Sequence, residues 1–205
     1  MSSQWLRWAK RLNAIAQAGL TYSEGPYDLE RYHQLRDIAG EIIAGHSNLP
    51  PAQIVDILRR EAGYPTPKVD VRGAVFRNNQ ILLVRERSDG RWTLPGGWAD
   101  VNETPAECVV KEVREESGYH TRAVKLLAVW DKSQHSHPEH FFHTYKLFFR
   151  CEITGGAPAE SLETDGVDFF NEDNLPPLST DRTTPEQIRR MFVHYRNPDL
   201  ATEFD

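Results

Sequence analysis

The 205-residue chain lacks any long uncharged apolar run, and this absence excludes several classes of protein. No window approaches the roughly 18 apolar residues of a membrane-spanning helix, and the N-terminal segment lacks the apolar core of a signal peptide. We therefore expect a cytoplasmic protein with no membrane partner. The two cysteines, Cys108 and Cys151, are too few for a disulfide framework, and their spacing matches no zinc motif.

An excess of basic charge is also missing. The chain has 24 Lys and Arg against 30 Asp and Glu, which gives a net charge of −6. Nucleic acid and anionic membranes attract positive surfaces, so nucleic acid is an unlikely partner by charge. An anionic substrate would need local help, such as a metal ion.

The chain is predicted to divide into a helical part and a strand-rich part. Apolar residues recur at helical spacing in three segments that start near Trp5, Leu29 and Ile54, and Gly19 is predicted to end the first helix. Two prolines in residues 63–67 stop helix and predict a linker. We therefore predict a small all-helical domain over residues 1–66 and a second domain over residues 67–205.

The second part follows a strand pattern with two helices. Residues 69–86 contain two β-rich runs around Asn78 and Asn79, which predict a hairpin because Asn tolerates positive φ. Further strands are expected within residues 91–98, where the strand runs into glycines, and over residues 121–131, 141–153 and 165–170, with a closing helix over residues 184–195. Helices followed by strands around one central helix, and then by a last helix, predict an α+β fold.

Residues 111–118, KEVREESG, place three glutamates in a predicted helix. Thr104 to Glu107 reads as a capping box with proline at the first helical position, so the helix should run from Pro105 to about Ser117. Its predicted apolar face is formed by Ala106, Val109, Val110 and Val113, with Glu116 at the border. Like charges four residues apart repel, and the C-terminal half of a helix disfavours acids. A solvated surface is one interpretation, and a Mg²⁺ site that uses the carboxylate oxygens is the other.

The wider context distinguishes these interpretations. From Gly97 the chain reads GWADVNETPAECVVKEVREESGY, which resembles the Nudix box, the signature of hydrolases that cleave a nucleoside diphosphate linked to another group X. The positions in register are Gly97, Glu103, Glu112, Val113, Glu115, Glu116, Gly118 and Tyr119. One position departs, because Lys111 stands where the motif has arginine. The resemblance implies a Nudix α/β/α sandwich.

By position, the resemblance assigns metal binding to Glu112, Glu115 and Glu116. It gives Gly97, Glu103 and Lys111 supporting roles, although a lysine cannot hold a carboxylate bidentately as arginine can. One carboxylate must also accept a proton from the attacking water. The candidates for this catalytic role are Glu115 and Glu116 within the box and Glu163 outside it.

Substrate contacts are expected from two places. Arg72 and Arg85 lie on the strands before the box and could bind diphosphate. His135 and His137 begin a loop that also holds His140 and His143; its spacing matches no standard zinc site, so we interpret it as the mouth of the pocket.

Residues 8–42 resemble the helical domain that precedes the Nudix fold in a subgroup acting on CDP-choline, ADP-ribose and related compounds. In that subgroup the helices help to form a homodimer. The two resemblances together predict Mg²⁺-dependent hydrolysis, with Mn²⁺ as a substitute, of a small nucleoside diphosphate derivative to a nucleoside monophosphate and phosphorylated X. The alternatives are a hydrolase of nucleoside triphosphates or RNA 5′ ends, and a non-catalytic nucleotide sensor.

Overall fold

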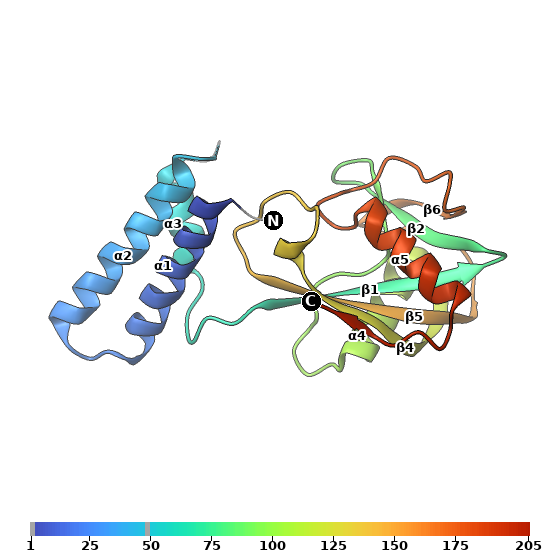
Figure 1. The fold of residues 1–205 in the computed structure, drawn as a ribbon, viewed down its shortest axis with the longest axis horizontal. Coiled ribbons are helices and arrows are strands. Elements are labelled where there is room, and N and C mark those ends of the chain that lie inside the picture. Colours follow the sequence, from blue (N-terminus) through green and yellow to red (C-terminus); the bar gives the residue numbers. More distant parts are fainter. Residues whose placement is uncertain (1–2, 48–49) are drawn as a thin grey trace. The chain divides into compact units, whose positions relative to one another are not determined.

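The computed structural model describes residues 3–47 and 50–205, and the chain forms two compact units. The first comprises residues 1–67 and 139–143, and the second comprises residues 68–138 and 144–205. Figure 1 shows helices in the first unit and a sheet with helices in the second. Residues 139–143 differ from expectation, because Phe141 packs against the core of the helices instead of beginning a strand.

The first unit consists of α1 (Gln4–Tyr22), α2 (Pro26–Ala44) and α3 (Pro51–Arg59). Its core contains Leu6, Ala9, Ile43, Ile54 and Leu58. The prediction that Gly19 ends the first helix is wrong, because α1 continues to Tyr22. A Cβ atom at Gly19 would lie 2.4 Å from ring atoms of Tyr32, so the glycine allows α1 and α2 to approach closely.

The second unit is built on a mixed sheet with the strand order β3-β2-β1-β5-β4-β7, in which β6 also pairs with β2. The elements of this sheet are β1 (Lys68–Arg77), β2 (Gln80–Glu86), β3 (Trp92–Thr93), β4 (Tyr119–Asp131), β5 (Thr144–Gly156), β6 (Thr164–Phe170) and β7 (Glu203–Phe204), and a short helix, η1 (Lys132–Gln134), follows β4. The predicted hairpin is confirmed: β1 and β2 pair antiparallel, and Asn78 and Asn79 have φ angles of 51° and 59°. β1 also pairs with β5 in parallel.

Helices cover both faces of the sheet (Figure 1). On one face, α4 (Pro105–Ser117) packs Val109 and Val113 against Val71 and Val75 of β1. On the other face, α5 (Pro185–Arg196) contributes a second apolar cluster with strand residues such as Phe148. This arrangement confirms the expected sandwich, which follows a helical N-terminal region in the sequence.

The predicted bounds of α4 are confirmed in detail. Thr104 and Glu107 form the reciprocal capping box, and Gly118 ends the helix with a left-handed φ of 76°. The predicted inward face needs one correction, because Ala106 is exposed and Cys108 takes its place beside Val109 and Val113. The sequence pattern therefore predicted the bounds of the helix correctly, but the buried face includes Cys108 in place of Ala106. Within the described residues, no helix is long and apolar enough to cross a membrane.

Candidate active site

The three glutamates of α4 lie in three different environments. Glu115 is exposed, Glu112 is half-buried, and Glu116 retains only 5% of its accessible surface. A carboxylate oxygen of Glu116 accepts a hydrogen bond from the backbone N–H of Gly96 at 2.8 Å. Burial raises the pKa of Glu116 to about 8, although Arg72 and the Gly96 N–H favour its ionised form. A nearby cation would therefore be needed to keep this side chain charged at neutral pH.

Gly97 leaves room for Glu112. A Cβ atom at residue 97 would lie 3.0 Å from Oε2 of Glu112, so any larger residue would push against this carboxylate. Burial raises the pKa of Glu112, and the neighbouring Glu115 adds to the effect, while Arg72 opposes it. The glycine and the helix together fix a carboxylate in a position that is electrostatically unfavourable without a cation.

Glu163 is brought to this cluster from a distant part of the sequence. The hydroxyl of the next residue, Thr164, donates to the carbonyl oxygen of Glu116 at 2.7 Å. The carbonyl of Glu163 accepts from the N–H of Arg87 at 2.8 Å. Its own side chain is exposed, and its charge contributes to the raised pKa of Glu112. The Thr164 hydroxyl and the Arg87 N–H thus hold this part of the chain beside α4.

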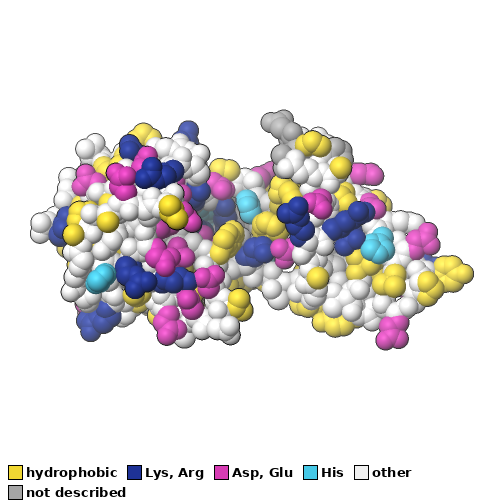
Figure 2. Space-filling model, turned by 180° about the vertical axis from the view of Figure 1, so that it is seen from behind, with side chains coloured by type: hydrophobic (Ala, Val, Ile, Leu, Met, Phe, Trp, Pro, Cys, Tyr) yellow, Lys and Arg dark blue, Asp and Glu magenta, His cyan; other side chains and the backbone are white. Residues whose placement is uncertain are grey.

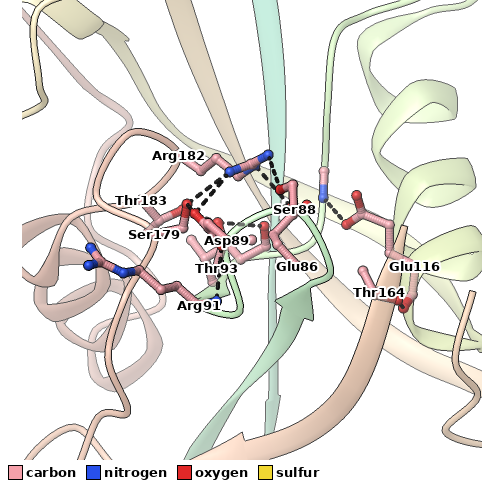
Figure 3. A network of polar contacts seen from close by, with 12 residues as sticks. Glu86, Ser88, Asp89, Arg91, Thr93, Glu116, Thr164, Ser179, Arg182 and Thr183 are labelled. Carbon is pink, nitrogen blue, oxygen red and sulfur yellow. Dashed lines mark hydrogen bonds and ion pairs between the residues drawn. The ribbon is translucent and has the colours of Figure 1, made fainter. Parts of the chain in front are cut away.

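Sequence reasoning missed Glu86, a buried carboxylate at the end of β2. It is 6% exposed and forms an ion pair with Arg182, whose Nε lies 3.1 Å from Oε1. Burial raises the pKa of Glu86, Arg182 and Arg72 oppose the rise, and Glu163 adds to it. Figure 3 shows Glu86 and Arg182 in one polar network, with Glu116 nearby. The only signal in the sequence was an acidic residue at the end of a predicted apolar strand.

Lys111 holds the loop that leads into α4. Its Nζ lies 2.5 Å from Oδ2 of Asp100 and 2.9 Å from Oε2 of Glu103. Hydrogen bonds to these two carboxylates raise the pKa of Lys111 well above its usual value. In this structure the lysine therefore supports the loop containing Glu103, and its charge also favours the ionised form of Glu112.

Arg72 requires a correction, because it was expected to contact substrate. Its side chain is 4% exposed and bonds Asp70 through Nε at 2.9 Å and Nη2 at 2.8 Å, with Nη1 on the carbonyl of Leu94. Lys146 also donates to Asp70 at 2.7 Å. Arg72 is therefore a buried positive charge near the glutamates. It lowers the pKa of Glu112 and of Glu116 and so favours their ionised forms.

The other predicted substrate ligands bond to protein groups outside α4. Arg85 pairs with Asp165 at 2.7 Å, and His135 lies 3.1 Å from Asp205. His137 lies 2.7 Å from the carbonyl of Thr180, and burial lowers its pKa to about 4. The imidazole of His137 is thus directed to the protein, while contact of Arg85 and His135 with substrate stays a prediction.

The donor set fits a hard divalent cation, although the carboxylates are not gathered around one point. Among residues 3–47 and 50–205, no group of three His, Cys, Asp or Glu side chains converges closely enough to hold a metal ion. The charge of Glu112 nevertheless adds to the raised pKa of Glu116, the charge of Glu115 adds to the raised pKa of Glu112, and Gly97 leaves space beside Glu112. All of the donors are carboxylate oxygens, which Mg²⁺ and Mn²⁺ bind together with water and phosphate.

Comparison with known proteins identifies the family of the chain. The NUDIX domain family matches residues 66–192. The chain belongs to the Nudix family. A second family, described as the UDP-X-like N-terminal oligomerisation domain, matches residues 3–58. The chain is therefore a Nudix pyrophosphohydrolase, of a family that generally uses divalent metal cations.

Relatives cover the whole Nudix chain. It is 50% identical over 205 residues, 100% of this chain and 99% of the other, to a Bacillus subtilis (strain 168) protein named "Putative ADP-ribose pyrophosphatase YjhB". A crystal structure of a UDP-X diphosphatase aligns with a TM-score of 0.65 and 32% identity over 98% of both chains. An ADP-ribose pyrophosphatase structure from Streptococcus suis 89-1591 aligns with a TM-score of 0.63 and 40% identity over 68% of this chain and 100% of that one.

Proposed function

We propose that this Nudix enzyme hydrolyses the diphosphate bond of a small nucleoside diphosphate derivative, with ADP-ribose as the first candidate and CDP-choline as the second. The products would be a nucleoside monophosphate and the phosphorylated X group. The observation that carries the proposal is the set of α4 carboxylates, Glu112, Glu115 and Glu116, which differ in burial, with Gly97 beside Glu112. The substrate class is supported by the name of the full-length relative at 50% identity.

Each carboxylate has a proposed role. Glu112, Glu115 and Glu116 would hold Mg²⁺, with Mn²⁺ as a substitute. The bound cation would neutralise charge on the phosphate oxygens and lower the pKa of a bound water. Glu116 is held in place by the Gly96 N–H, and Arg72 behind it limits the repulsion among the acids.

Glu163 is our preferred proton acceptor for the attacking water, ahead of Glu115 and Glu116. Its exposed side chain stands outside α4, while Thr164 and Arg87 hold its backbone in place. A carboxylate that is not a metal ligand can accept a proton without giving up a bond to the cation. Lys111 would support the site indirectly, by fixing Glu103 and the loop after Gly97.

The test is the identity of the products. The purified chain would be incubated with ADP-ribose, CDP-choline, a UDP-sugar, a nucleoside triphosphate and 5′-triphosphorylated RNA, with Mg²⁺ and with Mn²⁺ separately. We expect AMP and ribose 5-phosphate from ADP-ribose. Inorganic diphosphate released from the triphosphate as the main product would support the first alternative, and tight ADP-ribose binding without any product would support a nucleotide sensor. Acidic and basic side chains are interspersed on the second unit in Figure 2, which does not favour RNA on that face.

We also propose that the helical unit forms a homodimer. Trp8, Ile15 and Tyr22 are spaced seven residues apart along α1 and are 54%, 54% and 70% exposed. Seven residues are close to two helical turns, so the three side chains form one apolar stripe. A second copy of this chain is the proposed occupant, because the family that matches residues 3–58 is described as an oligomerisation domain. Exposed apolar stripes of this kind are typical of association surfaces.

A further inference from the structure

An ion pair between the buried carboxylate of Glu86 and the half-buried guanidinium of Arg182 lies outside the Nudix box. We propose that Glu86 is a further carboxylate of the metal site and that Arg182 is the positioning residue that holds it. The inference rests on the proposed function, because it extends the same site. It concerns two residues that the box does not contain and that come together only in the folded chain.

The register of β2 directs Glu86 toward the α4 side of the sheet. Side chains alternate between faces along a strand, and Leu82, four residues earlier, packs in the cluster that contains Val109 and Val113 of α4. The pairing of β2 with β6 shifts register between Arg85 and Glu86, so β6 has an extra residue at this point. Because the extra residue belongs to β6, the alternation along β2 continues unbroken to Glu86. Irregularities of this kind occur often beside active sites.

Glu86 interacts electrostatically with the other acids. It contributes to the raised pKa of Glu116, and Glu163 contributes to the raised pKa of Glu86. Arg72 acts on Glu86, Glu112 and Glu116 alike. Glu86 therefore belongs to the same electrostatic cluster as the proposed ligands, although it comes from the sheet and they come from the helix.

Arg182 reaches Glu86 from the loop before α5 and is itself held on several sides. Its Nε lies 3.1 Å from Glu86, Nη1 donates to the Ser179 hydroxyl at 2.9 Å, and Nη2 donates to the Ser88 hydroxyl at 3.2 Å. Nη1 also lies 3.4 Å from Asp89, which accepts a hydrogen bond from Ser179 at 2.7 Å. Figure 3 shows these side chains converging on the guanidinium.

The loop that carries Arg182 is fixed at each neighbouring residue. The N–H of Ser179 donates to the carbonyl of Trp92 at 2.8 Å, and the hydroxyls of Thr183 and Thr93 lie 2.9 Å apart. His137 bonds to the carbonyl of Thr180, and Lys132 pairs with Asp181 at 2.9 Å. A guanidinium on a rigid loop can fix the direction of a carboxylate, because its donors have a set geometry.

A divalent cation would explain why an acid, and not an apolar residue, occupies this buried position. A buried carboxylate whose charge acts on Glu116 adds repulsion to a cluster that already contains several acids. An apolar side chain would fill the end of β2 without that cost. With a divalent cation present, the same charge attracts the ion and helps to hold the neighbouring carboxylates in place. Burial raises the pKa of Glu86, and the Arg182 guanidinium opposes that rise and favours the ionised carboxylate.

The experiment measures Mn²⁺ binding to the full chain by electron paramagnetic resonance, without any nucleotide. Glu86→Gln should weaken Mn²⁺ binding by about 10- to 100-fold, the usual effect of removing a supporting group around a metal. Arg182→Ala should also weaken binding, and Arg182→Lys should restore part of the loss. The matched controls are Glu152→Gln and Arg122→Ala, which remove an exposed ion pair with a 3.0 Å separation on β4 and β5. Both controls should bind Mn²⁺ as the wild type does.

Wild-type Mn²⁺ affinity in folded Glu86→Gln would overturn the proposal. If circular dichroism shows that Glu86→Gln does not fold, the Mn²⁺ affinities of Glu86→Asp and Arg182→Lys decide instead. Reduced affinity in both variants supports the proposal. Wild-type affinity in either variant overturns it. The proposed function fails separately, when the wild-type chain binds Mn²⁺ but hydrolyses none of the nucleotides in the panel.

Discussion

Replacing Glu116 by glutamine should make the metal-free protein less sensitive to alkaline pH. The pKa of Glu116 is raised by burial to about 8, against an ordinary value of 4.5, so the folded chain binds this proton more tightly than the unfolded chain. The free energy of unfolding of the wild type should therefore fall as pH rises from about 4.5 to about 8. Glutamine does not titrate, so the variant should lack this component of the fall.

The size of the effect follows from the same two values. At about 1.4 kcal/mol for each tenfold change in proton affinity, ionising Glu116 in the folded chain costs at most about 5 kcal/mol. Between pH 5 and pH 9, the stability of Glu116→Gln relative to the wild type should accordingly rise by up to about 4 kcal/mol. For a chain of this size that corresponds to about 2 to 4 °C in Tm for each kcal/mol.

The assay is thermal unfolding of both proteins across this pH range in EDTA, repeated with Mn²⁺. All other titrating groups contribute equally to the pH dependence of the free energy of unfolding in both proteins, so the difference between the proteins isolates Glu116. At pH 9, Mn²⁺ should raise the Tm of the wild type and have little effect on Glu116→Gln, because the cation binds the native state through this carboxylate. A stability difference that does not change with pH, or an equal response of both proteins to Mn²⁺, would refute the reasoning.

Further predictions concern the residues around Glu116. Gly97→Ala should raise the Mg²⁺ concentration needed for half-maximal activity by about tenfold, because the new Cβ would press on Glu112; a Mg²⁺ titration checks this, and an unchanged midpoint would contradict it. Lys111→Arg should keep wild-type turnover, whereas Lys111→Met should lower it by releasing Glu103, as steady-state kinetics will show. Glu163→Gln should reduce kcat by about 100- to 10,000-fold while Mn²⁺ affinity stays unchanged; weaker Mn²⁺ binding would instead make Glu163 a ligand. Ile15→Glu should convert the proposed dimer to a monomer in light scattering, and a persistent dimer would place the interface elsewhere.

Local features of this chain could be predicted from sequence because their causes are local. The capping box and Gly118 set the ends of α4, and the Asn78-Asn79 pair set the hairpin turn. The box glutamates were found by their spacing on one helix. These features depend on backbone conformation and on neighbours only a few residues away.

Features that depend on distant parts of the chain were missed. Gly19 resembled a helix end, but the approach of Tyr32 from α2 explains it. Arg72 looked like a ligand until pairing of β1 with β5 placed Asp70 opposite Lys146 and created a buried network. Glu86 and Arg182 meet because the chain returns to β3 near residue 178, and no short sequence pattern records that contact.

The most direct test of the central claim is turnover of ADP-ribose by the wild type and by the Glu115→Gln, Glu116→Gln double variant at saturating Mg²⁺. Products would be separated by anion-exchange chromatography, with Glu152→Gln as the control for loss of an exposed acid. The account predicts AMP and ribose 5-phosphate from the wild type and the control, and a loss of at least about 100-fold in the double variant. Wild-type turnover in the folded double variant would contradict it.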